Sequence, residues 1–356
     1  MRVAQIAPLY ESVPPRLYGG TERVVSHLTE ALVEQGHEVT LYASGDSVTR
    51  AHLRPGCERA LRLGGRMEDA VIDHLYLFEQ AAREAAQFDI IHSHVDFIGF
   101  PFLRRMPKPH LSTLHGRLDL PNLGKLFSEY REQPLVSISQ QQREPQPAAR
   151  WLATVYHGLP EGLHELHGSP GRYLAFMGRL SPEKRVDVAI EIARLCGMPL
   201  KIAAKIDQRD KEYVERQVKP LLKDPRVEFL GEIAEHEKGE FLGNALALLF
   251  PVDWPEPFGL VMIEALACGT PVIARACGSV PEVIQHGVTG YLFRSIEEAV
   301  RAVGAVSGIN RHQCRREFER RFAVTRMAAD YVQVYERLVE ATPQPSIRVL
   351  ERARAA

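Results

Sequence analysis

Two glutamates, Glu256 and Glu264, are separated by seven residues within the segment 250–274. This segment has the pattern of a buried strand end, a proline-rich bend, a helix and a second buried strand. The first amides of the helix lack intrahelical acceptors and lie at the positive end of its macrodipole. An anionic or polyhydroxylated ligand could therefore meet N–H donors and two carboxylates together; the alternative is a surface helix with solvated glutamates. The amides concerned are those of Phe258, Gly259 and Leu260.

Two cations, Arg179 and Lys184, follow the expected strand at residues 173–177. Ser181 is a suitable N-cap and Pro182 a suitable first helical residue, so the two cations are expected to flank a helix start. Arginine offers a planar fork and lysine a point charge, and together they suit a diphosphate. The alternative is an ordinary solvated basic turn.

Histidines end two strands expected in the first half of the chain. His94 closes the strand at residues 88–94, and His115 follows the strand at residues 111–114. Ligand sites of open parallel sheets lie beyond the carboxyl ends of the strands, so both side chains are expected on the ligand face. A metal site formed with His92 is disfavoured, because the histidines come from separate strands without a supporting carboxylate pattern.

Gly19 and Gly20 place two amides without side chains at the start of a helix, which suits close approach to a phosphate or a sugar. The alternative is a plain turn with an N-cap at Thr21. The preceding loop contains neither G-x-G-x-x-G nor G-x-x-x-x-G-K-[ST]. A nicotinamide or flavin site is therefore disfavoured and a P-loop is excluded.

The elements that must position these residues alternate between strand and helix in both halves, which predicts parallel sheets in an α/β protein. The segment 160–172 is rich in Gly, Pro and His and marks the expected domain boundary. We expect three parts: residues 1–165, residues 166–325, and a helix and tail at 326–356. The first half is expected to end in a strand at 154–160; the second has strands at 200–204, 227–230, 246–250, 272–274 and 291–293.

The composition is that of a globular protein, with 356 residues, 45% hydrophobic and 25% charged. A net charge of −1 gives no general drive toward nucleic acid. The five cysteines are scattered without a C-x-x-C pair, so neither a zinc site nor a disulfide framework is indicated, and we expect a cytoplasmic protein. No signal pattern or membrane-spanning apolar run is present.

Taken in order, these segments resemble the retaining glycosyltransferases of family 4, which have the GT-B architecture. The loop before Gly19 is most similar to that of the subgroup with avilamycin-type antibiotic glycosyltransferases. The resemblance covers nearly the whole chain and rests on Gly19-Gly20-Thr21-Glu22-Arg23-Val24, His94, Leu114-His115-Gly116, Gly178-Arg179-Leu180-Ser181-Pro182-Glu183-Lys184, Phe229-Leu230-Gly231 and the paired glutamates.

The resemblance implies two Rossmann-like, doubly wound domains facing a cleft, with the helix at 326–340 crossing back to the first domain. The acceptor would bind mainly to the first domain and the nucleotide sugar mainly to the second. Arg179 and Lys184 match diphosphate ligands, Glu256 matches a residue that binds the hydroxyls of the transferred sugar, and Glu264 matches one that binds the ribose. The remaining matches are His115 near the reacting carbon, Gly19 and Gly20 over the phosphates, His94 at the donor, amides 258–260 at the sugar or phosphate, and Gly231 near the base.

A nucleoside diphosphate leaving group needs positive charge more than a proton donor. The sequence has no Asp-x-Asp motif and no obvious carboxylate nucleophile, so we expect a metal-independent, front-side transfer of a hexose with retention. No cofactor is expected, since the nucleotide sugar, UDP favoured over GDP, is a co-substrate. The alternatives are a GT-B sugar phosphorylase or nucleotide-sugar epimerase, and a non-catalytic sugar-nucleotide-binding module. The acceptor would be a small molecule, a saccharide or a lipid-linked hydroxyl; docking on a membrane through residues 100–108 is a less favoured alternative.

Overall fold

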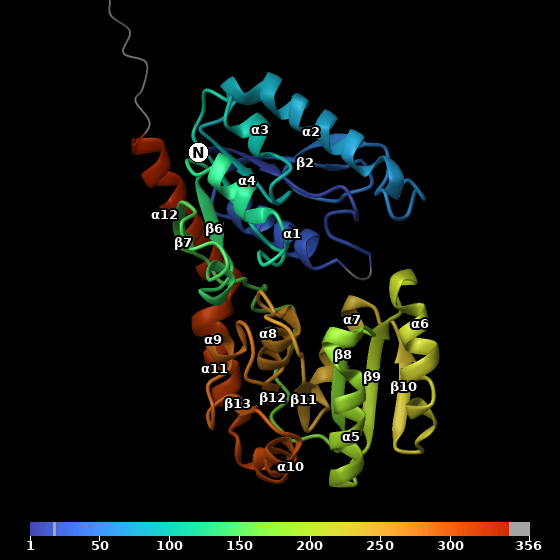
Figure 1. Cartoon of the computed structure of the whole chain (residues 1–356). Coiled ribbons are helices and arrows are strands. Elements are labelled where there is room, and N and C mark those ends of the chain that lie inside the picture. The colour runs from blue at the N-terminus through green and yellow to red at the C-terminus, as the bar shows by residue number, and fades with distance from the viewer. Residues whose placement is uncertain (17–18, 342–356) are drawn as a thin grey trace, which may run out of the picture.

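The computed structural model describes residues 1–16 and 19–341 (Figure 1). The first half forms a parallel seven-stranded sheet in the order β3-β2-β1-β4-β5-β6-β7. The reversal of strand order on the two sides of β1 is the doubly wound pattern, which places ligand sites at the carboxyl ends of the central strands. The strands are β1 (Arg2–Ile6), β2 (Glu38–Ser44), β3 (His52–Cys57), β4 (Ile90–Ser93), β5 (His110–Thr113), β6 (Leu135–Ser137) and β7 (Trp151–Thr154).

The second half forms a separate parallel six-stranded sheet in the order β10-β9-β8-β11-β12-β13. It too reverses direction, between β8 and β11, so both halves have the α/β topology that the alternating pattern predicts. The predicted boundary at residue 165 falls in the segment between β7 and β8. The strands are β8 (Leu174–Arg179), β9 (Leu200–Lys205), β10 (Val227–Gly231), β11 (Ala247–Phe250), β12 (Val272–Arg275) and β13 (Gly290–Phe293).

Helices connect the strands of each sheet and cover its faces (Figure 1). The first half contains α1 (Gly20–Glu34), α2 (Ala70–Glu84), α3 (Phe100–Leu103) and α4 (Leu123–Glu129). The second half begins with α5 (Val186–Cys196), α6 (Lys211–Tyr213), α7 (Glu235–Gly243) and α8 (Leu260–Ala267). It ends with α9 (Val280–Val283), α10 (Ile296–Ala305), α11 (Arg311–Phe322) and α12 (Val324–Ala341).

The last helix, α12, leaves the second half and packs on the first, as predicted (Figure 1). Its Tyr331 and Tyr335 are fully buried in a cluster with β1 and β4. The Tyr335 hydroxyl lies 3.0 Å from Gln5 Nε2 and 2.7 Å from His92 Nδ1. This buried polar contact fixes the rotation of the helix against the first domain. The tail at residues 342–356 lies outside the described residues.

Two local predictions are wrong, and one strand was not predicted. The strand expected at 154–160 is β7, which ends at Thr154. Strand β3 was not predicted because it contains Pro55 and Gly56, and it is tolerated as an edge strand. The helix expected to start at Ser181 is a 3₁₀ turn at Pro182–Lys184, after which Arg185 adopts a left-handed conformation (φ 55°) and α5 begins.

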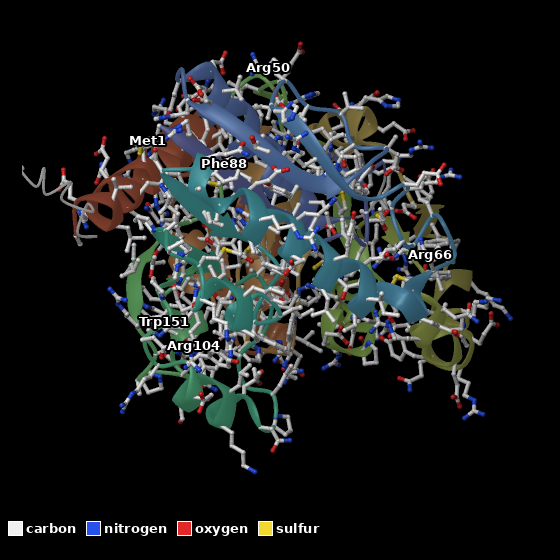
Figure 2. The ribbon with its side chains drawn as sticks, turned by 90° about the horizontal axis from the view of Figure 1, so that it is seen from above. Met1, Arg50, Arg66, Phe88, Arg104 and Trp151 are labelled. Atoms are coloured by element: carbon white, nitrogen blue, oxygen red, sulfur yellow. The ribbon has the colours of Figure 1, made fainter. Side chains whose placement is uncertain are left out.

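Seen from above, the first domain carries charged side chains around its rim, including Arg50, Arg66 and Arg104 (Figure 2). Arg50 pairs with Glu30 at 2.6 Å, and its side chain is 57% exposed. Such solvated pairs contribute little to stability. Among the described residues, none of the helices has both the length and the apolar character for a membrane span. In α3, Phe100 and Leu103 are buried in the domain, and Phe102 is half-buried against Phe78.

Candidate functional site

A cleft of about 670 Å³ lies between the two domains. Its first wall comes from the carboxyl ends of β1, β4 and β5 and the start of α1, and its second wall from β8, β9 and the bend before α8. The structure brings together at this cleft all but one of the residues predicted to form the site. They are Gly19, Gly20, His94, His115, Arg179, Lys184, Glu256, Phe258, Gly259, Leu260 and Glu264.

Gly231 is the exception. It ends β10 with a φ of 74°, a conformation that favours glycine, and it does not line the cleft. Its neighbours Glu232 and Ile233 do. The left-handed residue turns the chain so that the two following residues point into the cavity, so its effect on a ligand would be indirect.

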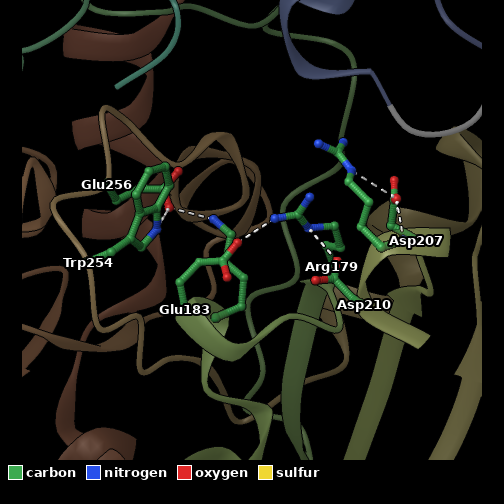
Figure 3. A network of polar contacts seen from close by, with 8 residues as sticks. Arg179, Glu183, Asp207, Asp210, Trp254 and Glu256 are labelled. Atoms are coloured by element: carbon green, nitrogen blue, oxygen red, sulfur yellow. Dashed lines mark hydrogen bonds and ion pairs between the residues drawn. The ribbon is translucent and has the colours of Figure 1, made fainter. Parts of the chain in front are cut away.

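Arg179 is the last residue of β8, and its guanidinium lies between two carboxylates (Figure 3). It contacts Glu183, and its Nε lies 3.4 Å from Asp210 Oδ2. Neither acid was singled out from the sequence. The pairing holds the arginine at the cleft, but an incoming phosphate would compete with Glu183 and Asp210 for the same donors.

Lys184 and Glu256 form an ion pair in which Nζ lies 2.5 Å from Oε2, and the Trp254 indole donates a 2.7 Å hydrogen bond to the same oxygen (Figure 3). Glu256 is only 9% exposed, so the lysine and the indole compensate much of the cost of burying its charge. Trp254 was missed in the sequence, although a tryptophan in a proline-rich bend at a strand end is an available signal. The bend therefore presents a lysine, an indole and a carboxylate side by side.

Glu264 lies on α8 and is 3% exposed. Lys238 of α7 donates a 2.8 Å hydrogen bond to Glu264 Oε1 and lies 3.0 Å from Glu235 Oε2. Burial alone would raise the pKa of the Glu264 carboxyl, but Lys238, together with His164 and Arg23, outweighs burial and lowers it below its ordinary value. The carboxylate is therefore held ionised at the cleft wall.

A line of histidines crosses the first wall. His94 Nε2 lies 2.7 Å from Gln5 Oε1, and His94 Nδ1 lies 2.9 Å from His115 Nε2. The ring of His157 stacks on His115 at 5.3 Å, and Phe258 of the second wall packs edge-on against His157. Burial lowers the pKa of His115 to about 3 and lowers the pKa values of His94 and His157 well below the ordinary range. The imidazoles are thus neutral at physiological pH.

His157 was not predicted as a site residue because the sequence placed it inside a strand. It lies three residues beyond the end of β7, which is the same relation to a strand end that marks His94 and His115. His92 has both ring nitrogens within hydrogen-bond distance of buried hydroxyls, at 2.7 Å from Tyr335 and 2.8 Å from Thr113. It therefore anchors α12 and does not reach the cleft.

Two carboxyls with raised pKa values accompany these histidines. Burial raises the pKa of Glu22, in the first turn of α1, to about 7. Burial also raises the pKa of Asp96, whose Oδ1 accepts a 3.1 Å hydrogen bond from the His115 amide. Asp96 adopts a left-handed conformation (φ 39°), which is uncommon outside glycine and points to a functional constraint. It fixes the loop that carries His115.

One cluster in the described residues has the donor types of a metal site. The ligand atoms of His164, Glu235 and Glu264 lie within 4.8 Å of one another. The same carboxylates already pair with Lys238 and, for Glu235, with Arg23. A divalent ion there would have to displace two cations, so the cluster fits an ion-pair network better than a metal centre.

Comparisons with known proteins agree with this arrangement. The family model described as "Glycosyltransferase Family 4" matches residues 18–157, and the model described as "Glycosyl transferases group 1" matches residues 165–311. A D-inositol 3-phosphate glycosyltransferase of Mycolicibacterium paratuberculosis is 27% identical over 251 residues, 60% of this chain. The chain spans 57% of the length of that relative.

Two solved structures share the fold over nearly the whole chain. AviGT4, a glycosyltransferase involved in avilamycin A biosynthesis, superposes with a TM-score of 0.72 at 23% identity and covers 96% of this chain and 98% of its own. The Anabaena protein HepE, solved with UDP and glucose, gives a TM-score of 0.74 at 18% identity, with 95% and 100% covered. The two family models and the two facing parallel sheets agree: the chain belongs to glycosyltransferase family 4 and has the GT-B fold.

Proposed function

We propose that the protein is a retaining, metal-independent glycosyltransferase that moves a hexose from a nucleoside-diphosphate sugar to a hydroxyl acceptor. UDP is the favoured nucleotide. The convergence of Arg179, Lys184 and Glu256 on one wall, opposite the neutral His115 on the other, carries the proposal. Cations face where a diphosphate would develop charge, and neutral hydrogen-bonding groups face where a sugar would sit.

The donor would lie along the second wall. Arg179 and Lys184 would hold the diphosphate, exchanging part of their contact with Glu183 and Glu256 for phosphate oxygens. Glu256, released from part of its pairing with Lys184, would accept hydrogen bonds from sugar hydroxyls, and Glu264 would bind the ribose. The amides of residues 258–260, at and just before the start of α8, would reach the sugar or phosphate, and Gly19 and Gly20 would approach from the first wall. UDP is favoured because the similar fold of HepE was solved with UDP and glucose.

The transfer would break the bond between the anomeric carbon and the diphosphate oxygen and form a bond to the acceptor oxygen on the same face. The acceptor proton would pass to the departing phosphate oxygen. The low pKa of His115 makes it a weak base, which agrees with a hydrogen-bonding role near the reacting carbon. The charge on the leaving group would be met by side-chain cations and helix amides, so the scheme needs no metal ion.

A thermal-shift panel of UDP, GDP, ADP and their sugars tests the donor. A ligand that binds only the native state raises the melting temperature, so UDP or UDP-sugars should stand out. Metal independence is tested by turnover in excess EDTA, and retention by the anomeric configuration of the product. Consumption of a disaccharide with inorganic phosphate would support a phosphorylase instead, and nucleotide binding without any turnover would support a binding module.

A further inference from the structure

Four charged side chains form a continuous alternating chain from the donor wall across the cleft. Glu264 of α8 contacts Lys238 at 2.8 Å, Lys238 contacts Glu235 at 3.0 Å, and Glu235 contacts Arg23 of α1. The last contact joins the two domains, because α1 belongs to the first domain and α7 to the second. The residue to which the ribose is assigned is thus connected by three successive ion pairs to the opposite wall.

These pairs differ from the solvated pairs on the rim. The side-chain exposures are 4% for Glu264, 14% for Lys238, 27% for Glu235 and 7% for Arg23. Burying charges is costly unless each is compensated, so removing one member leaves its neighbour unpaired in a poorly solvated place. The chain has two positive and two negative members, and its charges balance only when Arg23 is engaged from the other domain.

Arg23 lies one turn beyond the start of α1. Its amide donates a 3.2 Å hydrogen bond to the Gly19 carbonyl, and Gly20 is the first residue of the helix. When Arg23 contacts Glu235, the helix start that carries the two glycines is therefore held against the donor wall. The Arg23 side chain therefore contacts the second domain only when α1 is in place.

We infer that Arg23 and Lys238 are positioning residues for Glu264, and that they couple its orientation toward the ribose to the seating of α1 across the cleft. Lys238 holds the Glu264 carboxylate directly. Arg23 neutralises Glu235 and so leaves Lys238 available to Glu264; without Arg23, Lys238 would have to serve two carboxylates. This inference rests on the proposed function for the ribose site.

The test compares two ligands that differ only in the ribose hydroxyls, UDP and 2′,3′-dideoxy-UDP, by calorimetric titration of the full chain. We expect the wild type to bind UDP at least tenfold more tightly than the dideoxy analogue. In Lys238→Met the ratio of the two dissociation constants, dideoxy analogue over UDP, should fall to within twofold of one. In Arg23→Ala it should fall at least threefold, because the effect passes through Glu235 and Lys238. A general loss of packing would weaken both ligands equally and leave the ratio unchanged.

The control is Arg50→Ala, which removes a pair on the same domain, with Glu30 of α1, that does not reach the second domain. It should keep the wild-type ratio. The double variant Arg23→Ala with Glu235→Gln should bring the ratio back toward wild type, because Lys238 then has only Glu264 to serve. Equal weakening of both ligands in Arg23→Ala, or a ratio in the double variant no higher than in Arg23→Ala, would overturn the inference.

The outcome is separable from that of the proposed function. If the wild type binds UDP but shows no preference over the dideoxy analogue, Glu264 does not read the ribose and the inference fails while a nucleotide site remains. If no nucleotide of the panel binds, the proposed function fails. The melting temperatures of Arg23→Ala, Glu235→Gln and the double variant, measured without ligand, then still decide whether Arg23 and Glu235 attract across the cleft: the loss in the double variant should be smaller than the sum of the two single losses.

Discussion

The two walls of the cleft hold ionisable groups in opposite ways. On the first wall, burial favours the neutral forms: it lowers the pKa values of His94, His115 and His157 and raises those of Glu22 and Asp96. On the second wall, Arg179, Lys184 and Lys238 are each matched by carboxylates. The histidines and these two carboxyls of the first wall thus favour uncharged, hydrogen-bonding forms, and the second wall offers ion pairs that a charged ligand can enter.

The difference follows from how each wall is built. The histidines of the first wall lie ring against ring and are buried, so desolvation disfavours a first charged imidazole and repulsion between like charges further disfavours a second. The second wall alternates cations and anions along short turns, so every charge has a partner within reach. In the proposed function the diphosphate would meet the ion pairs of the second wall, and the sugar would lie between the two walls.

The largest expected effect follows from removing two cations of the second wall. Replacing both Arg179 and Lys184 with Ala should lower kcat/KM for the donor by about 10⁴-fold, since each donor to a developing charge contributes roughly 10²–10³-fold. Steady-state turnover of the nucleotide sugar measures it. Lys201→Ala removes a cation of β9 that pairs with Glu228 and does not line the cleft, and it should leave turnover unchanged. Intact turnover in the double variant would refute the phosphate clamp.

The next effect concerns the first wall and is measured as a change in the free energy of unfolding. The pKa of Glu22 is about 7 in the folded chain against an ordinary value of 4.5, so the folded state binds more protons than the unfolded state between these pH values. Its contribution is fully present below pH 4.5 and is lost as the pH rises through 7, by roughly 3 kcal/mol. Urea unfolding of wild type and Glu22→Gln at pH 4.5 and 8 measures it as the difference in unfolding free energy between the two proteins, in which the titration of the shared buried histidines cancels. Relative to Glu22→Gln, the wild type should lose roughly 3 kcal/mol between pH 4.5 and 8.

The matched control for that measurement is Glu34→Gln, which alters an exposed glutamate at the other end of the same helix. It should follow the wild-type pH dependence. If Glu22→Gln also followed it, folding would not favour the neutral form of Glu22. The contrast between the two walls would then rest on the histidines and no longer on the carboxyls.

Much of this site could be predicted from the sequence because it follows from strand ends. His94, His115, Arg179 and Glu256 all lie at or just beyond the carboxyl ends of parallel strands, and local pattern is enough to find such positions. His157 escaped only because the end of β7 was placed too late. The fold positions these residues, and the local periodicity of the sequence predicts that fold.

The partners of these residues could not be found in the same way. Lys238 and Glu235 lie on α7, where a lysine three residues after a glutamate is typical of any solvated helix face. Their contacts with Glu264 and Arg23 depend on how α7, α8 and α1 are placed in space. Trp254 likewise acquires its role only when the bend folds back on Glu256. Pairing between side chains of different elements leaves no pattern in the sequence.

A smaller effect is expected from the histidine line itself. His115→Asn should lower kcat about 10- to 100-fold through loss of a placed hydrogen-bonding group. Because its pKa is about 3, the wild-type rate should show no acid limb from this residue between pH 5 and 8. A pH–rate profile of both proteins checks it, with the exposed His52→Asn as control. An acid limb near pH 6.5 that disappears in His115→Asn would mean that the imidazole titrates in the working range.

The smallest expected effect concerns the charge of the acceptor. On the first wall, Arg62 is already paired with Glu11 at 2.5 Å, whereas Glu22 and Asp96 face the same cleft. At pH 8, where Glu22 is ionised, glucuronate should compete for the acceptor site roughly tenfold less well than glucose, because like charges at a buried site are mutually destabilising. At pH 6 the carboxyl of Glu22 is largely protonated while glucuronate keeps its charge, so the discrimination should shrink, and Glu22→Gln should show the smaller ratio at both pH values. Equal competition at pH 8 would mean that the first wall does not select a neutral acceptor, and its raised carboxyl pKa values would then reflect packing alone.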